Sequence, residues 1–137
     1  MKQTNFYNKK NNTVELVQSN FQKNKVQWNT DIDYKDNAGF IFIYTTWCET
    51  CHTMKDWYEN LADYWKYDFH MGAVNAMDIK HGNDELTAKM GIQGFPVFYS
   101  VDIDGTIRKL DVILNCEMIY ESMLNKVDEV RGKRTML

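Results

Sequence analysis

The most constraining feature of the sequence is the stretch Phe40–Lys55, which reads FIFIYTTWCETCHTMK. It begins with an apolar and aromatic run typical of a buried strand, and it continues with residue types typical of a helix. Cys48 and Cys51 stand at the junction, separated by two residues. Two cysteines at this spacing, between a strand and a helix, indicate a redox site.

The start of a helix favours the reactive form of the first thiol. Unpaired backbone N–H groups and the positive end of the helix dipole both stabilise a negative charge there. The thiolate is the nucleophile in thiol chemistry. We therefore predict that Cys48 attacks a disulfide and that Cys51, one turn further on, resolves the mixed disulfide.

Other uses of the cysteine pair remain open on the residues alone. The two thiols could be buried structural groups, or Cys48–His52 could be a CxxCH haem-attachment motif. A zinc site would need two more ligands, and the remaining candidates show no second paired spacing: Cys116, His52, His70 and His81. We expect neither a metal nor a cofactor. Cys116 fits the inner stripe of a helix and is expected to be a small core residue, the alternative being a third redox cysteine.

Two motifs together resemble the thioredoxin superfamily: Trp47-Cys48-x-x-Cys51 and, further along, Gly94-Phe95-Pro96. The opening Val14-Glu15-Leu16, followed by Ser19-Asn20-Phe21, is most similar to the catalytic domains of protein disulfide isomerases. The resemblance covers residues 14–130. It implies an α/β thioredoxin-like fold, with a central mixed β-sheet flanked by helices. It also implies a thiol–disulfide oxidoreductase that acts on protein disulfides and that a separate reductase or oxidase resets.

The resemblance assigns substrate binding to Trp47, Phe95 and Pro96. Trp47 is expected to shield the sulfurs and to help dock the substrate, although it could equally be a core aromatic. Pro96 is the chain's only proline. In the resembled family the matching proline follows a cis peptide bond opposite the cysteines, and the backbone beside it pairs with an extended substrate. We expect a cis Phe95–Pro96 bond facing Cys48; a trans proline that starts a strand is the alternative.

Three residues around the cysteines are expected to tune their reactivity: Glu49, Thr50 and His52. In the resembled isomerases the two residues between the cysteines are usually Gly-His, whereas here they are Glu49 and Thr50. The negative charge of Glu49 should disfavour the thiolate of Cys48 and make the pair less oxidising. The helix dipole and a charge on His52 act in the opposite direction, and a solvated Glu49 would have little effect.

The sequence departs from the resembled family at one position below the cysteines. In that family an acidic residue stands six positions before the first cysteine and is thought to move protons to and from the second. That position is Phe42 here, and the lysine that commonly accompanies it is also missing from the next strand, at Ala73-Val74-Asn75. We expect the fold to tolerate the loss of both members of the pair. Catalysis is expected to be slower, because Cys51 must lose its proton before it attacks.

The hydrophobic pattern predicts one domain at 13–131, between a flexible tail at 1–12 and a basic tail at 132–137. The predicted helices begin at Ser19 (with Gln22 in a capping box), after the cysteines, at Asn83 and at Asn115. The predicted strands are Val14–Val17, Phe40–Tyr44, Val74–Ile79, Val97–Val101 and Thr106–Val112.

Composition narrows the possible partners. The 137 residues carry a net charge of −3, which gives no reason to expect nucleic acid or an anionic membrane as a partner. No apolar run approaches the roughly 20 residues needed to span a bilayer, and the N-terminus has no apolar block of signal-peptide type. Three cysteines argue against a disulfide-stapled secreted domain. We therefore expect an intracellular, cytosolic monomer.

The alternative to an enzyme is a binding or chaperone-like module that keeps the fold but turns over poorly.

Overall fold

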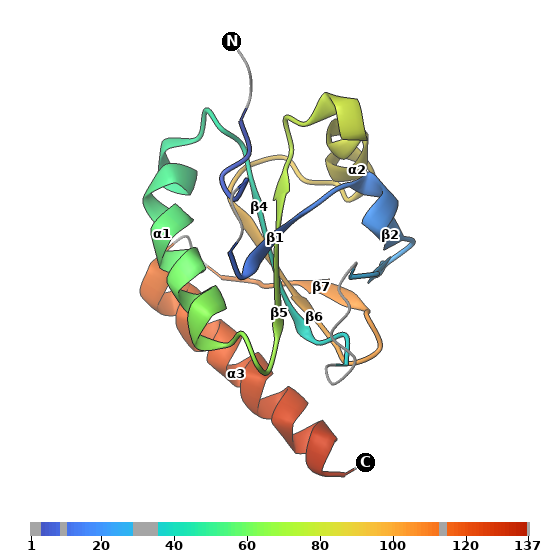
Figure 1. Cartoon of the computed structure of the whole chain (residues 1–137), viewed down its shortest axis with the longest axis vertical. Coiled ribbons are helices and arrows are strands. Elements are labelled where there is room, and N and C mark those ends of the chain that lie inside the picture. The colour runs from blue at the N-terminus through green and yellow to red at the C-terminus, as the bar shows by residue number, and fades with distance from the viewer. Residues whose placement is uncertain (1–3, 9–10, 29–35, 113–114, 137) are drawn as a thin grey trace.

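The computed structural model describes residues 4–8, 11–28, 36–112 and 115–136. Their central element is a five-stranded sheet in the order β1-β5-β4-β6-β7, with helices on both faces (Figure 1). Strands β1, β5 and β4 run parallel, and β6 and β7 continue the sheet in antiparallel fashion. The elements are β1 (Thr13–Leu16), η1 (Gln18–Asn20), β2 (Phe21–Gln22), β3 (Lys25–Val26), β4 (Gly39–Tyr44), α1 (Glu49–Tyr64), β5 (His70–Asn75), η2 (Ile79–His81), α2 (Asn83–Lys89), β6 (Val97–Val101), β7 (Ile107–Lys109) and α3 (Cys116–Thr135).

The predicted class, an α/β fold with a mixed sheet between helices, is confirmed by this topology. Its central strand, β4, is buried along its whole length between β5 and β6. The even-numbered side chains of β4 pack in the cluster that contains Met54 of α1 and Met123 of α3, and Ile41 and Ile43 pack with Leu86 of α2. Both faces are therefore covered, which explains why this strand has an unbroken apolar sequence. None of the helices in the described ranges is both long and apolar enough to cross a membrane.

The last helix begins where its sequence predicts. The side chain of Asn115 accepts hydrogen bonds from the backbone N–H groups of Glu117 and Met118, as a helix cap does. The predicted inner stripe is buried against the sheet: Ile119, Met123, Val127 and Val130. This packing places α3 next to α1 on the same face (Figure 1).

The predicted helix that begins at Ser19 is wrong. The chain makes one short 3-10 turn, η1, and then a small antiparallel hairpin of β2 and β3. Asn20 is the reason, because its side chain accepts a hydrogen bond from the N–H of Val17 and donates one to the carbonyl of Gln27. These bonds bring the two ends of the hairpin together, and Lys23 at its tip has a φ of 57°. Local side-chain bonding of this kind competes with helix formation.

The predicted strand at Val74–Ile79 is displaced toward the N-terminus and is β5, which spans His70–Asn75. Its pairing with β4 sets the boundaries, since His70 lies opposite Gly39 and Asn75 lies opposite Tyr44. The side chain of Asn75 accepts a hydrogen bond from the N–H of Met77, which turns the chain away from the sheet.

Both ends of the domain extend beyond the predicted limits of 13 and 131. Within the segment predicted as an N-terminal tail, Phe6 and Tyr7 are buried in the core between the sheet and α1. At the other end α3 continues to Thr135, and the Arg134 guanidinium pairs with the Asp36 carboxylate at 2.8 Å. The partners of Phe6, Tyr7 and Arg134 lie far from them in the sequence, so the local sequence does not predict these contacts.

Tyr58 connects α1 to the two central strands, and its removal should weaken the fold. Its hydroxyl donates to the carbonyl of Gly72 at 2.8 Å and lies 3.0 Å from the carbonyl of Phe40, in a fully buried position. A Tyr58→Phe variant leaves these carbonyls without that donor and should lose about 1–2 kcal/mol in free energy of unfolding. Urea denaturation measures the loss. Tyr64→Phe, at an exposed position of the same helix, is the control and should change stability by less than about 0.5 kcal/mol. Equal effects of the two substitutions would contradict the prediction.

Candidate active site at the start of α1

Cys48 occupies the N-cap position of α1, directly after the turn that follows β4. Its Sγ accepts a hydrogen bond from the backbone N–H of Cys51 at 3.2 Å. Its own N–H donates to the carbonyl of Thr45 at 3.4 Å, which closes the turn. The sulfur thus lies among the N–H groups at the positive end of the helix, where a thiolate is stabilised.

Cys51 lies one turn further along and is completely buried, whereas 6% of Cys48 remains exposed. Burial, and then the neighbouring Cys48 side chain, raise the pKa of the Cys51 thiol to about 12. A backbone hydrogen bond from the Thr45 position acts against this shift. Cys51 therefore keeps its proton at neutral pH unless its surroundings change or another group takes the proton.

The loop before β6 faces the cysteines. The Phe95–Pro96 peptide bond is cis, as predicted. The carbonyl oxygen of Phe95 lies 3.7 Å from the Cys48 sulfur, within the range of an S–H···O contact. The structure therefore brings together Cys48 and the loop of the only proline, which are far apart in the sequence.

Trp47 stands beside this contact at the surface. Two-thirds of its side chain (66%) is exposed, and its ring meets the Phe95 ring edge-on at 6.1 Å. A hollow continues from here along the Phe95–Pro96 loop to the segment after β7, and it is lined by Ile92, Gln93, Phe95, Pro96, Leu110 and Val112, among others. Trp47 is therefore not a core aromatic residue. Its exposed ring packs against Phe95, whose carbonyl contacts the Cys48 sulfur.

The three predicted tuning residues all point away from the core. Glu49 and Thr50 are exposed at the first turn of α1. The ring of His52 is exposed too, and its Nε2 donates to the carbonyl of Thr46 at 2.6 Å. This bond fixes the ring against the turn that precedes Cys48, and the Phe6 ring lies 4.8 Å from it on another side.

Apolar side chains fill the position below the cysteine pair. Phe42 is fully buried and stacks on Phe98 with 5.0 Å between ring centroids, and Tyr58 packs beside it. Ala73, its neighbour on β5, is buried as well. Neither position offers a group that could accept a proton from Cys51.

Glu15 is a functional candidate that sequence reasoning missed. Its Oε2 accepts hydrogen bonds from the Tyr44 hydroxyl at 2.6 Å and from the N–H of Tyr7 at 3.0 Å. Burial raises the pKa of the Glu15 carboxyl to about 7, and these two hydrogen bonds oppose the shift. A signal was present in the sequence, because an acidic residue between two apolar ones in a short strand can point into the fold.

The other metal and redox candidates are engaged elsewhere in the fold. His70, in β5, bonds the carbonyl of Asp36 and stacks on Trp28, and His81 pairs with Asp78. Cys116 starts α3 and is partly buried, which raises the pKa of its thiol. Among the described residues, no three His, Cys, Asp or Glu side chains are grouped as metal ligands.

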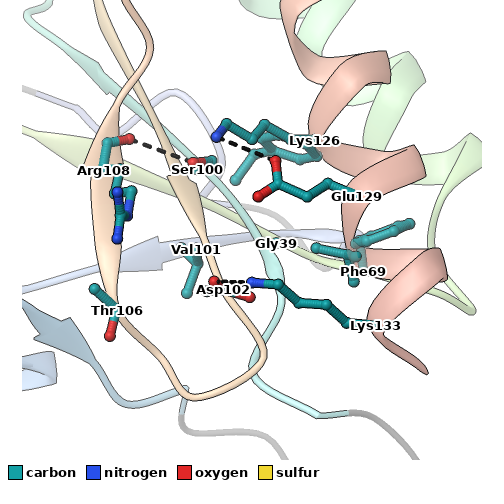
Figure 2. A pocket seen from close by; sticks show the side chains of 12 residues that line it. Gly39, Phe69, Ser100, Val101, Asp102, Thr106, Arg108, Lys126, Glu129 and Lys133 are labelled. Atoms are coloured by element: carbon teal, nitrogen blue, oxygen red, sulfur yellow. Dashed lines mark hydrogen bonds and ion pairs between the residues drawn. The ribbon is translucent and has the colours of Figure 1, made fainter. Parts of the chain in front are cut away.

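A second hollow lies between the β6–β7 hairpin and α3 (Figure 2). Of the charged side chains that line it, four pair with one another: Lys133 with Asp102 at 2.5 Å and Lys126 with Glu129 at 3.4 Å. None of the residues predicted from the sequence for the active site lines it. Of these two hollows, the one beside Pro96 is lined by Phe95, whose carbonyl lies next to the Cys48 sulfur.

Comparison with known proteins identifies the architecture. The thioredoxin family model matches residues 12–125. A candidate protein disulfide-isomerase from Dictyostelium discoideum is 30% identical over 99 residues, which are 71% of this chain; the match spans 22% of that longer protein. The structure of thioredoxin f from spinach chloroplast superposes with a TM-score of 0.60 at 18% identity, covering 87% of this chain and 86% of that one. Thioredoxin f2, solved in complex with ferredoxin:thioredoxin reductase, gives 0.60 at 19% identity, covering 87% and 94%.

The raised pKa of Glu15 should appear in the pH dependence of stability. The folded state holds this proton up to about pH 7, whereas an unperturbed glutamate releases it near 4.5. Between these values the folded state binds more protons, so this group lowers the stability of the wild type as the pH rises. Glu15→Gln lacks the effect. Relative to wild type, the variant should gain on the order of 3 kcal/mol between pH 4 and pH 8, since one pKa unit corresponds to about 1.4 kcal/mol.

Urea unfolding at several pH values measures this difference. Glu121→Gln, at an exposed position of α3, removes the same charge and is the control, which should not reproduce this gain. If Glu15→Gln and wild type keep a constant difference in free energy of unfolding from pH 4 to pH 8, the Glu15 assignment is wrong.

Proposed function

The chain belongs to the thioredoxin family, and on that premise we propose that it is an oxidoreductase acting on disulfide bonds of proteins. The family match and the CxxC pair support thiol–disulfide oxidoreductase chemistry in general. One observation carries the proposal further. The Cys48 sulfur lies at the N-terminus of α1, 3.2 Å from the N–H of Cys51 and 3.7 Å from the carbonyl of Phe95.

In the first step Cys48 is the nucleophile. Its sulfur is the more exposed of the two and is the one bonded by a helix N-terminal N–H group. The thiolate attacks one sulfur of the substrate disulfide, and the S–S bond of the substrate breaks as a Cys48–substrate disulfide forms. The other substrate sulfur leaves as a thiolate and takes a proton from water.

In the second step Cys51 releases the substrate. Once it has lost its proton, its sulfur attacks that of Cys48, and the remaining substrate sulfur leaves. The substrate disulfide has then been reduced by two electrons and Cys48–Cys51 has become the disulfide. The high pKa of Cys51 and the apolar side chains of Phe42 and Ala73 support slow release.

Polypeptides are the substrate class that fits the surroundings of Cys48. Next to the sulfur Trp47 is exposed and Phe95 is half-buried. The adjoining hollow, which the buried Pro96 also lines, provides room for the side chains of an extended segment. Exposed apolar surface of this kind is typical of protein-binding sites. A separate reductase or oxidase must return the pair to its starting state, and the complex of thioredoxin f2 with ferredoxin:thioredoxin reductase supports a reductase in this role.

A binding or chaperone-like module is the second candidate. The apolar side chains of Phe42 and Ala73 favour it, because they leave Cys51 without an adjacent carboxylate. Such a module would use the same aromatic surface but would not depend on Cys48.

The roles of the two cysteines can be separated by serine substitution. Cys51→Ser should accumulate a mixed disulfide with a disulfide-containing test protein such as insulin, because the resolving thiol is absent. Cys48→Ser should form none and should lose reductase activity by at least about a hundredfold. Non-reducing gel electrophoresis and turnover with dithiothreitol measure the two effects. Cys116→Ser, outside the pair, is the control. If Cys48→Ser retains full biological activity, the binding module is the better description.

Glu49 should hold the reduction potential of the pair at a more reducing value. Its carboxylate is next to the sulfur of Cys48 in sequence and disfavours a thiolate there. Glu49→Gln should therefore stabilise the reduced form and shift the potential by about 10 to 30 mV in the oxidising direction, since 30 mV corresponds to about 1.4 kcal/mol. The shift should diminish in high salt, because the side chain is exposed.

Trp47 fluorescence in graded glutathione buffers gives the potentials. Glu59→Gln, further along the same helix, is the matched charge control and should leave the potential unchanged. A potential that does not move in Glu49→Gln, at low salt, would remove Glu49 from the tuning residues.

A further inference from the structure

The release step requires that the buried Cys51 thiol lose a proton, and the nearest side chains on the sheet cannot accept it. Phe42 and Ala73 are apolar, and the ring of His52 donates to the carbonyl of Thr46 instead. The question of where the proton goes rests on the proposed function, since it concerns the second step of that reaction. Among the residues that the structure describes, the carboxyl group that fits on this side of the sheet is that of Glu15.

Glu15 occupies the same row of the sheet as Phe42. In the strand registers Glu15 lies opposite Ala73, and Ala73 lies opposite Phe42. Residues paired in this way direct their side chains to the same face. Since neighbouring strands are about 4.8 Å apart, the backbone of Glu15 is about 10 Å from that of Phe42. The carboxyl group therefore faces the layer that holds α1 and Cys51, two strands away from the apolar position.

The hydrogen bonds of Glu15 are unequal. Its Oε2 is bonded by the Tyr44 hydroxyl at 2.6 Å and by the N–H of Tyr7 at 3.0 Å. Its Oε1 is also buried but accepts no hydrogen bond from the described residues. One oxygen thus fixes the group in place, and the other keeps lone pairs that can take a proton.

The same contacts lead from Glu15 to the helix of Cys51. Tyr44 accepts a hydrogen bond from the N–H of Phe6 at 2.8 Å and stacks on the Phe6 ring with 3.9 Å between centroids. The Phe6 ring in turn lies against that of His52, the residue after Cys51. The Tyr7 hydroxyl donates to the carbonyl of Lys55 in α1 at 2.7 Å.

We propose that Glu15 is a positioning residue for substrate release, which holds Phe6 and Tyr7 against the helix of Cys51 and gains a proton as Cys51 loses one. The proton leaves Sγ of Cys51 and its equivalent is taken up at Oε1 of Glu15. The thiolate of Cys51 forms the bond to Sγ of Cys48, the Cys48–substrate bond breaks, and the substrate sulfur leaves with the electron pair and is protonated by water. Glu15 later returns its proton to solvent.

The cost of a second buried negative charge is the physical reason for this coupling. A thiolate at Cys51 together with an ionised Glu15 would place two negative charges in the same interior of low dielectric constant, where each charge is costly. Proton uptake by Glu15 keeps the number of buried negative charges at one.

The charges around the pair set the pH at which this can operate. Burial and the Asp78 charge raise the pKa of Glu15, the bonds from Tyr44 and Tyr7 lower it, and the result is about 7. The groups that face Tyr7 extend this environment to α1, because burial and then the charges of Glu15, Glu59, Asp56 and Cys51 raise the pKa of its hydroxyl. On the same side, Lys55 lies over the Phe6 ring and His52 beside it. At pH 8 Glu15 is ionised and able to take a proton.

The test separates the two steps of the reaction in the full-length chain. The probe is a fluorescent peptide joined by a disulfide to Cys48, and its release is followed in a single turnover from about pH 5 to pH 9. Wild-type release should accelerate as the pH rises through about 7 and then level off. Glu15→Gln keeps an acceptor for Tyr44 and Tyr7 but cannot gain a proton. Its release should be at least about tenfold slower at pH 8 and should lack the inflection near pH 7.

Two further variants keep the result interpretable. Tyr44→Phe removes a hydrogen bond that favours the ionised carboxylate, so the inflection should move to higher pH without disappearing. Glu121→Gln removes an exposed carboxylate of α3, outside this network, and should leave the profile of release unchanged. Urea unfolding of each variant confirms that it is folded at the pH of the assay.

The outcomes distinguish this inference from the proposed function. Formation of the mixed disulfide is measured separately in Cys51→Ser, with and without Glu15→Gln, and should be the same in both. If no mixed disulfide forms in either protein, the proposed function fails. If it forms normally but Glu15→Gln releases the probe with the wild-type rate and pH profile, the role of Glu15 is overturned. An equal loss in rate at every pH, with the inflection retained, would also overturn it, because that is the effect of a structural residue alone.

Discussion

The burial of β4 on both faces is the constraint on which the rest of the structure depends. Because this strand is apolar along its whole length, it can lie only in the middle of the sheet, with helices above and below it. The chain then has one direction in which to leave the sheet, and Thr45 and Cys48 close the turn that starts α1. The cysteine is thus placed at a helix N-terminus by the packing of a strand that carries no reactive group.

The acid–base properties of this site come from a wider region than the motif itself. Thioredoxin-family chemistry needs a thiolate at one cysteine and a proton acceptor for the other. The first need is met within four residues by the N–H of Cys51. The second is met, in our proposal, by Glu15 on an outer strand. The apolar residues Ala73 and Phe42 lie in the same row of the sheet as Glu15, between it and the cysteine pair, and Phe42 stacks on Phe98 there.

Sequence reasoning succeeded where a pattern is repeated along one element and failed where a single distant contact decides. The strand at Phe40–Tyr44, the helix after the cysteines and the cap at Asn115 follow from periodicity and from local hydrogen bonding. The predicted helix at Ser19 failed because the side chain of Asn20 bonds the carbonyl of Gln27 in a hairpin. Glu15 has no local sequence signature beyond its apolar neighbours, since its partners Tyr44 and Tyr7 come from other parts of the chain.

The position of Phe6 has a consequence for where this domain begins. A boundary drawn at the first strand, Thr13, would appear natural from the sequence, because the preceding residues are mostly polar. Such a fragment would lack the ring that stacks on Tyr44, and it would open the side of α1 next to His52 to water. The core of this family member therefore includes side chains that lie upstream of its sheet, and a fragment that begins at Thr13 would lack part of that core.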